Sequence, residues 1–163
     1  DKTFESENFG GFIQSAATAT DYFFPIGSNV LESLQGTGNV NPVSGFIQHA
    51  MCDTRILRIK FINFAVISSV QSVKLILYKY DGSGSPDVAS NMTQVGSDVD
   101  LTLSTGTMAD STYQYQAPSD WSVSAGDMWT LAIKQTNAFG SAKSLWFGGG
   151  LILEQNWNNM VSS

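Results

Sequence analysis

Hydrophobic and polar residues alternate along most of this chain, and that alternation predicts strands. The clearest stretch runs from Trp121 to Lys134. Trp121 and Val123 alternate with serines, and a second alternating segment follows Ala125-Gly126-Asp127. A period of two residues indicates a strand with one buried face, and glycine has the backbone freedom that a reversal needs. We therefore expect a strand, a tight turn and a second strand in one antiparallel unit.

Similar alternation recurs through the rest of the chain. The further strands expected are Phe12–Ala16, Tyr22–Ile26, Phe46–Met51, Thr54–Phe64, Ser72–Tyr80, Asp98–Ser104, Tyr113–Gln116, Leu145–Phe147 and Leu151–Leu153. Pro25 lacks an N–H and places its strand at a sheet edge or ends it there. The glycine run 148–150 predicts either a bulge or the close approach of another backbone. Apolar residues on both faces of 72–80 indicate that another strand, loop or chain covers part of the outer face.

No stretch has the sustained 3.6-residue period of a major helix, so the expected fold class is all-β. The strand spacing predicts an antiparallel β-sandwich or jelly roll of about eight to ten strands. We expect one jelly-roll domain over 10–157, an N-terminal arm or linker over 1–9, and a C-terminal tail over 158–163. The polar stretch 27–45 is expected to be a loop, either functional or a solvated connection.

Composition narrows the function classes. Only 13% of the 163 residues are charged, and the formal net charge is −6. Nucleic-acid binding needs a basic patch, and anionic membranes attract basic segments, so neither partner is expected. No apolar run approaches the roughly 20 residues of a membrane-spanning helix. The chain begins with Asp rather than Met, from which we expect a processed or longer polypeptide.

The sequence contains no convincing catalytic or metal-binding motif. Cys52 is the single cysteine, so it is either a buried free thiol or part of a bond between chains. His49 and Cys52 lie three positions apart, but no further Cys or His completes a zinc site. A Ser-His-Asp triad would have to use His49, which lies among apolar strand residues. We expect no enzyme activity, no metal and no cofactor.

Two pairs of carboxylates and several aromatic residues leave alternatives open. Asp81 with Asp87, and Asp98 with Asp100, suit either calcium or simple solvation, and paired carboxylates also occur in glycosidases.

Aromatic residues suit either stacking on sugars or packing. Trp121, Trp129 and Trp146 fall within strand patterns, which favours the core or a subunit interface. Tyr113 and Tyr115 alternate with glutamines and are the expected exposed pair for glycan or host contact.

The order of these features resembles the jelly-roll domains of tailed-phage and viral structural, decoration and fibre proteins, related in shape to tumour-necrosis-factor-like heads. The segments that carry the resemblance are Tyr22–Gly27, Pro42–Ile47, the strands Arg55–Asn63 and Ser72–Tyr80, interpreted as a pair, the Asp81-Gly82 turn, and Trp121–Asp127. The resemblance lies in strands and turns, without an invariant chemical motif. It implies a homotrimer that serves as a virion decoration, fibre or host-contact knob.

The resulting hypothesis is a non-enzymatic virion structural protein, namely a capsid decoration, head fibre or tail-fibre knob at the virion surface. Its N-terminal arm would contact other virion proteins, and its far loops would face the host. Trimerisation would bury outward apolar residues, for which Ile62, Ile76 and Tyr78 are the candidates. The alternative is a secreted carbohydrate-binding module, which would be monomeric and would bind sugars through Tyr113 and Tyr115.

Overall fold

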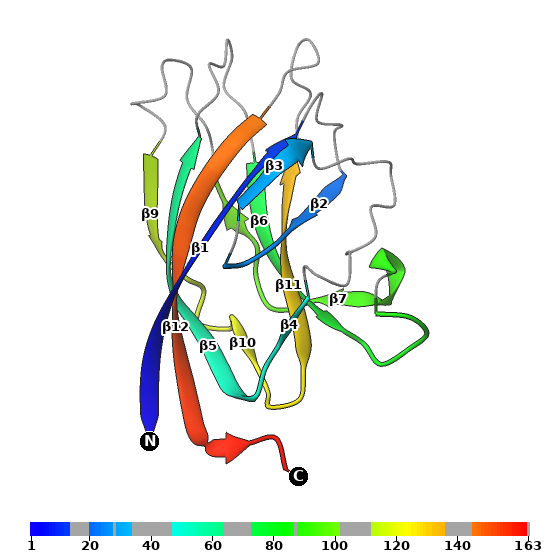
Figure 1. Cartoon of the computed structure of the whole chain (residues 1–163), viewed down its shortest axis with the longest axis vertical. Coiled ribbons are helices and arrows are strands. Elements are labelled where there is room, and N and C mark those ends of the chain that lie inside the picture. Colours follow the sequence, from blue (N-terminus) through cyan, green and yellow to red (C-terminus); the bar gives the residue numbers. More distant parts are fainter. Residues whose placement is uncertain are drawn as a thin grey trace.

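The computed structural model describes residues 1–13, 20–27, 29–33, 47–63, 73–86, 88–101, 112–135 and 145–162. Within these ranges the chain forms two six-stranded sheets packed face to face, as Figure 1 shows. The all-β sandwich expected from the alternating pattern is confirmed.

In the described ranges, the secondary structure consists of strands and one short 3₁₀ helix. The strands are β1 (Lys2–Ile13), β2 (Asp21–Phe24), β3 (Asn29–Ser33), β4 (Gln48–His49), β5 (Cys52–Asn63), β6 (Val73–Tyr80), β7 (Met92–Gln94), β8 (Val99–Asp100), β9 (Thr112–Gln116), β10 (Ser122–Val123), β11 (Met128–Gln135) and β12 (Leu145–Met160), and the helix is η2 (Ala89–Asn91). Within the described residues, no helix is long and apolar enough to cross a membrane.

The strand order is that of a jelly roll. Sheet A has the order β10-β5-β12-β1-β3, and β9 also pairs with β5. Sheet B has the order β2-β11-β6-β7, with β4 on β11 and β8 on β6. The principal strands therefore run β1-β12-β5-β9 in one sheet and β2-β11-β6-β8 in the other. In this arrangement the chain crosses repeatedly between two packed antiparallel sheets, as it does in jelly rolls.

The core lies between the two sheets and is built from the inward positions of both. Its largest fully buried side chains include Trp121, Tyr22, Phe9, Phe24 and Phe61. Trp121 is 0% exposed, and its indole N–H donates to the Ser97 carbonyl oxygen at 2.5 Å. The polar end of this large side chain thus has a hydrogen-bond partner at the edge of the core, as buried tryptophans require.

Two expected strand pairings are wrong, because the chain changes sheet where hairpins were expected. The segment around Trp121 does contain two strands and a turn, and Gly126 has φ +92°. However, β10 pairs with β5 in sheet A, whereas β11 pairs with β6 and β2 in sheet B. Similarly, β5 and β6 lie in different sheets. Alternation identifies which face of a strand is buried, but two facing sheets bury that face equally well.

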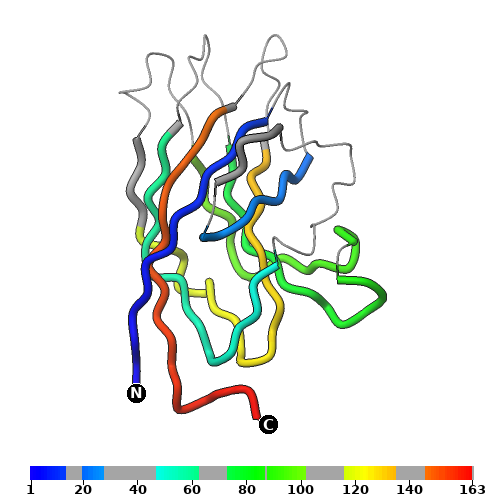
Figure 2. Tube along the Cα trace, in the orientation of Figure 1, coloured from blue at the N-terminus to red at the C-terminus, as the bar shows by residue number. Residues whose placement is uncertain are grey.

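Both ends of the chain form longer strands than expected. Residues 1–9, expected to be an arm, belong mostly to β1, which pairs with β12 from Lys2↔Asn156 to Ile13↔Leu145. The expected tail is also strand, because β12 continues to Met160. At the start of β1, Lys2 donates to Glu154 at 3.1 Å and the Thr3 hydroxyl donates to Gln155 at 3.3 Å, so side-chain hydrogen bonds add to the backbone pairing there. Both termini lie at the same end of the sandwich (Figure 2).

The glycine run and the polar stretch after β2 also differ from the simplest expectation. Gly148–Gly150 continue β12 without a bulge, and a Cβ atom on Gly149 would collide with the Lys60 backbone carbonyl. Of the two alternatives, close backbone approach is therefore the one observed. Part of the stretch expected to be a loop over 27–45 is strand β3, which pairs with β1, and residues 34–46 lie outside the described part. Pro25 follows β2, which ends sheet B as expected for an edge strand.

Candidate functional site

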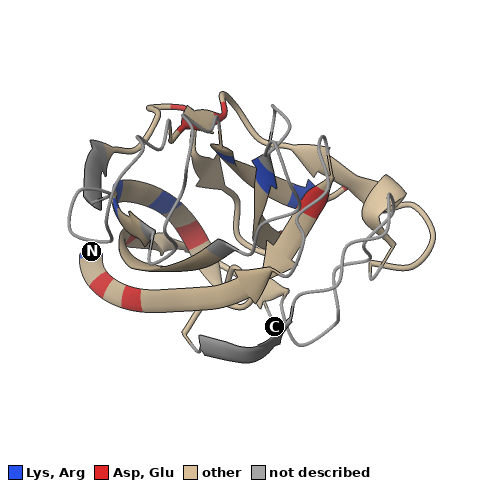
Figure 3. Ribbon diagram, turned by 90° about the horizontal axis from the view of Figure 1, so that it is seen from above, with Lys and Arg blue, Asp and Glu red and all other residues tan. Residues whose placement is uncertain are grey.

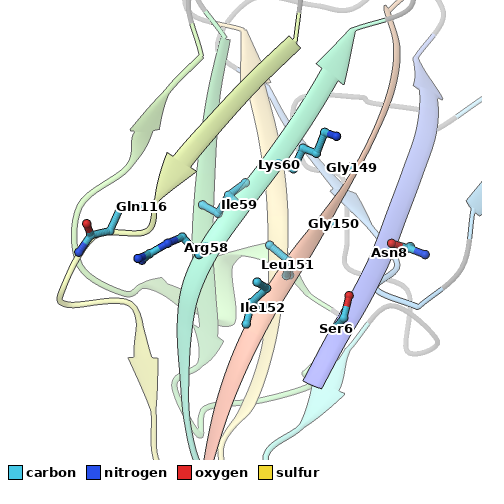
Figure 4. A pocket seen from close by; sticks show the side chains of 10 residues that line it. All are labelled: Ser6, Asn8, Arg58, Ile59, Lys60, Gln116, Gly149, Gly150, Leu151 and Ile152. Carbon is cyan, nitrogen blue, oxygen red and sulfur yellow. The ribbon is translucent and has the colours of Figure 1, made fainter. Parts of the chain in front are cut away.

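A groove crosses the outer face of sheet A, on the side away from the core. It has a volume of about 730 Å³ and spans four adjacent strands, β1, β12, β5 and β9 (Figure 4). Its lining residues are Ser6, Asn8, Arg58, Ile59, Lys60, Gln116, Gly149, Gly150, Leu151 and Ile152. This volume is within the usual range for a small-molecule site.

The groove exists because the middle strand lacks side chains there. The outward positions of β12 run through Trp146, Gly148, Gly150 and Ile152 in steps of two residues. The glycines form a low floor, while side chains of β1 and β5 rise on either side. Trp146 and Ile152, at the two ends of this floor, are 48% and 42% exposed. The outer face therefore combines a polar trough with apolar surface at both ends.

The β5 wall of the groove is positively charged. Arg58 and Lys60 are both exposed and occupy outward positions two residues apart, which places them about 7 Å apart along the strand. Among the described residues, the ion pairs are Lys2–Glu154, Lys74–Asp98, Lys79–Asp127 and Lys134–Asp21. Neither groove cation belongs to one of these pairs. Arg58 makes one hydrogen bond, from Nη1 to the adjacent Leu57 carbonyl oxygen at 3.1 Å, so its other N–H donors are available to a ligand.

Charged residues occur in few places on the described ribbon, as Figure 3 shows in a view from above. In a chain with a net charge of −6, most described lysines are neutralised by a neighbouring carboxylate. Among the described lysine and arginine side chains, the three outside these ion pairs are Arg55, Arg58 and Lys60, so the unpaired positive charge gathers on β5.

A second exposed surface lies at the end of the sandwich that carries both termini. Met51, Trp157, Met160 and Val161 are 58%, 37%, 58% and 44% exposed, and we call these four residues the apolar end. Backbone contacts join three of them, because the Val161 N–H donates to the Met51 carbonyl oxygen at 2.9 Å and Met160 pairs with Cys52. Trp157 is held by the N-terminal strand instead, since its indole N–H donates to the Thr3 hydroxyl at 2.8 Å.

The end is also fixed to the body of the protein. Asp53 accepts hydrogen bonds from the Ala125 backbone N–H at 2.9 Å and from the Asn159 amide at 2.6 Å. These two donors lower the pKa of the Asp53 carboxyl group. The strand end that carries Met160 and the β10–β11 turn are therefore joined through one carboxylate.

The residues proposed for a trimer interface occupy different environments. Ile76 is 2% exposed, so the chain itself already covers it, whereas Ile62 and Tyr78 are half-buried. The Tyr78 ring packs against Phe23 with ring centroids 5.6 Å apart, and its hydroxyl donates to Asp21 at 2.8 Å. Burial, followed by the hydrogen bond and charge of Asp21, raises the pKa of Tyr78, which keeps the hydroxyl protonated. The expectation that the outer face around β6 is covered is thus met within the chain.

The other candidate residues are separated in space or engaged locally. His49 is exposed on β4, whereas Cys52 is a buried free thiol on β5. Asp81 accepts hydrogen bonds from the N–H and hydroxyl of Ser83, which lowers its pKa, and Asp98 pairs with Lys74 at 3.0 Å. Among the described residues no group of three potential metal ligands gathers.

The remaining predicted site residues are Asp87, Asp100 and the aromatic residues. Asp87 lies outside the described residues, and Asp100 is exposed. Trp121 and Trp129 are buried as expected, but the core alternative for Trp146 is wrong. Tyr113 and Tyr115 pair through their backbones with Phe61 and Ile59, and their side chains lie outside the described part.

Sequence reasoning missed the groove entirely. Its cations come from β5, its amides and hydroxyl from β9 and β1, and its floor from β12. These segments are distant in sequence, and only the strand order brings them together. A usable signal was present in Arg58 and Lys60, which occupy alternate polar positions beside an apolar strand face, and in the glycine run.

Comparison with known proteins gives no family. No family model matches the chain, and no curated protein matches it. Among solved structures, the VP2 subviral particle of infectious bursal disease virus is 14% identical, with a TM-score of 0.46 over 98% of this chain and 34% of that one. A structure of the Gx strain of the same virus gives 14% identity and a TM-score of 0.44, over 95% and 32% of the two chains.

A bacterial structure is also among the matches. It is the xylanase 10B CBM22-1–GH10 modules of Clostridium thermocellum in complex with xylohexaose, which is 14% identical with a TM-score of 0.33, over 71% of this chain and 19% of that one. The present chain thus spans about a third or less of each of these three structures. Similarities at this level do not assign the chain to a family, and the jelly-roll description rests on its own strand order.

Proposed function

We propose that this protein is a non-enzymatic structural subunit that assembles through its apolar end, as a homotrimer on the surface of a virion. The observation that carries the proposal is the gathering of Met51, Trp157, Met160 and Val161 at the end of the sandwich where both termini lie. Contiguous exposed apolar surface commonly marks a contact with another protein. Jelly rolls serve as capsid domains, although they also occur in lectins and cupins, so the fold alone does not decide the role.

The proposed mechanism of assembly follows from the geometry. Three chains would bring their apolar ends together, which would remove the exposed methionine, valine and tryptophan side chains from water. This arrangement leaves the opposite end of each sandwich facing outward, where β5 and β11 end and β6, β9 and β12 begin. Ile76 contributes little to such an interface because it is already buried.

The mass in solution tests the proposal. The chain is expected to elute as a species of three times 17.6 kDa in size-exclusion chromatography with light scattering. A Met51→Ser, Met160→Ser double variant is expected to be monomeric. Ile152→Ser is the matched control, because it removes an exposed apolar side chain from the same strand at a position outside the apolar end. A monomeric wild-type protein at all concentrations would contradict the proposed assembly, and absence of the polypeptide from purified particles would contradict the virion role.

A secreted carbohydrate-binding module remains the second candidate function. The observation that favours it is the groove across sheet A, which offers amide, hydroxyl and cationic groups beside exposed apolar surface. A stable monomer that binds glycans would support this candidate against the first. A trimer that binds no glycan would support the first against this one.

A further inference from the structure

The groove of sheet A is the feature that carries an inference beyond assembly. Its surface is polar at the centre and apolar at the ends of its floor, and it lies apart from the apolar end. A ligand class for this groove rests on the second candidate function, the carbohydrate-binding module. A subunit of a particle could bind the same ligand.

We propose that the groove binds an acidic saccharide, whose carboxylate or sulfate groups are held by Arg58 on the β9 side of β5 and by Lys60 on the β12 side, as the two side chains point in Figure 4. The charge is the first argument. These two exposed cations line one wall and form no ion pair among the described residues, in a protein whose other described lysines are paired. A planar guanidinium matches an oxyanion with two parallel hydrogen bonds, and an ammonium attracts one as a point charge.

The neutral lining is the second argument. Gln116 extends the cationic wall from β9, since it pairs with Arg58 in register. Asn8 and Ser6 face it from β1, on the other side of the glycine floor. Side-chain amides and hydroxyls both donate and accept hydrogen bonds, which suits the hydroxyl groups of a sugar ring.

The floor is the third argument, because it allows a flat ring to lie close to the backbone. Gly150 has no side chain, and a Cβ atom there would lie 3.3 Å from the Asn8 Oδ1 atom and from the Glu7 carbonyl oxygen. Any side chain at this position would narrow the trough between Asn8 and Lys60. Exposed cations that interact only with solvent do not require a side-chain-free trough beside them.

Exposed apolar side chains at the outward positions of β12 favour a saccharide over a simple anion as the ligand. Ile152 lines the groove at one end of the glycine floor, and Trp146 precedes the floor at the other. The Trp146 ring packs against Phe12 with ring centroids 4.3 Å apart, so the ring is supported although it is 48% exposed. Sugar rings have apolar faces that pack on such surfaces, whereas inorganic sulfate has none.

The test measures binding by isothermal titration calorimetry with the full chain. The ligands are sialyllactose, which carries a carboxylate, a sulfated heparin tetrasaccharide, neutral lactose, and sodium sulfate alone. At least one acidic sugar is expected to bind about tenfold or more tightly than lactose and sulfate, and which one does so identifies the source of the charge. Binding of all four alike, or of none, overturns the proposal.

Variants locate the binding in the groove. Arg58→Gln and Lys60→Gln are each expected to weaken binding of the acidic sugar by about tenfold or more, because each removes a charge-assisted hydrogen bond. Arg55→Gln is the matched control, since Arg55 is an exposed cation on the same strand outside the groove lining. It is expected to leave the affinity unchanged. Equal losses in all three variants would show non-specific attraction and overturn the site.

The sugar-binding measurements test the groove separately from the proposed trimer. Light scattering on the same samples reports the oligomeric state, and none of the three substitutions lies in the apolar end. A trimer without sugar binding would refute the groove inference alone. Sugar binding by a monomer would refute the assembly alone.

Discussion

Gly149 occupies the most tightly confined glycine position in sheet A. A Cβ atom there would collide with the Lys60 carbonyl oxygen and would lie 2.8 Å from the ring of Phe9. The first neighbour is backbone in the middle of the β5–β12 pairing, so it cannot swing aside as a flexible side chain would. Gly149→Ala is therefore expected to force the two strands apart or to break their register locally.

The change in the free energy of unfolding caused by Gly149→Ala is the sum of two opposing terms. Inserting one carbon into a packed site costs up to about 3 kcal/mol, while replacing glycine in a strand by alanine returns about 0.5–1 kcal/mol of chain entropy. We expect a net loss of about 2 kcal/mol in the free energy of unfolding, which lowers the Tm of a domain of this size by about 4–8 °C.

Urea and thermal unfolding, each followed by circular dichroism, measure this loss. Gly150→Ala is the matched control, because its nearest contacts lie at 3.3 Å and one of them is the flexible Asn8 side chain. It should change stability by less than about 1 kcal/mol. The reasoning is refuted if Gly149→Ala is as stable as the wild type, or if both variants lose the same amount.

Three further predictions concern other parts of the fold. Trp121→Phe should lower the free energy of unfolding by about 2 kcal/mol, since it leaves a cavity and an unpaired Ser97 carbonyl, and a urea titration measures it. Tyr78→Phe should cost about 1.5 kcal/mol, because its hydroxyl donates to a carboxylate of β2, and an unchanged urea midpoint would contradict this. A hydrogen bond to Glu5, burial and the charge of Glu5 raise the pKa of Glu7. Ionising Glu7 therefore disfavours the folded state, and stability falls as pH rises through that pKa. Glu5→Gln should raise the Tm at about pH 7 but not below about pH 4, as a thermal scan at both values would show.

The alternating pattern was sufficient to identify strands but not their partners. Trp121, Trp129 and Leu131 are buried as the pattern predicts. The pattern on either side of Gly126 is nevertheless compatible with a hairpin and with a crossing between sheets, because each strand buries one face in both cases. Pairing is decided by contacts between segments that are distant in sequence, which a local pattern does not contain.

Strand length also depended on information outside the local sequence. Lys2 to Glu7 contains five polar residues and one phenylalanine, which indicated an arm. It is strand because β12 offers a complementary edge along its full length. On β5, alternation with the buried residues Ile59 and Phe61 would place Leu57 on the core face, but a register shift leaves Ile56 there instead. A bulge of this kind changes which residues share a face, and the alternation of polar and apolar residues does not indicate where a bulge occurs.

The first and last strands of the domain lie side by side in the middle of sheet A. Asp1 and Asn158 are 157 positions apart and in contact, and β12 joins β1 to β5. During synthesis, β1 therefore emerges long before its partner, and sheet A stays incomplete until residues 145–160 have left the ribosome. Such distant contacts favour slow folding, and the unpaired early strands expose edges on which nascent chains aggregate. Deleting β12 would remove the centre of a sheet rather than its margin, so truncation from this end should abolish folding instead of shortening the protein.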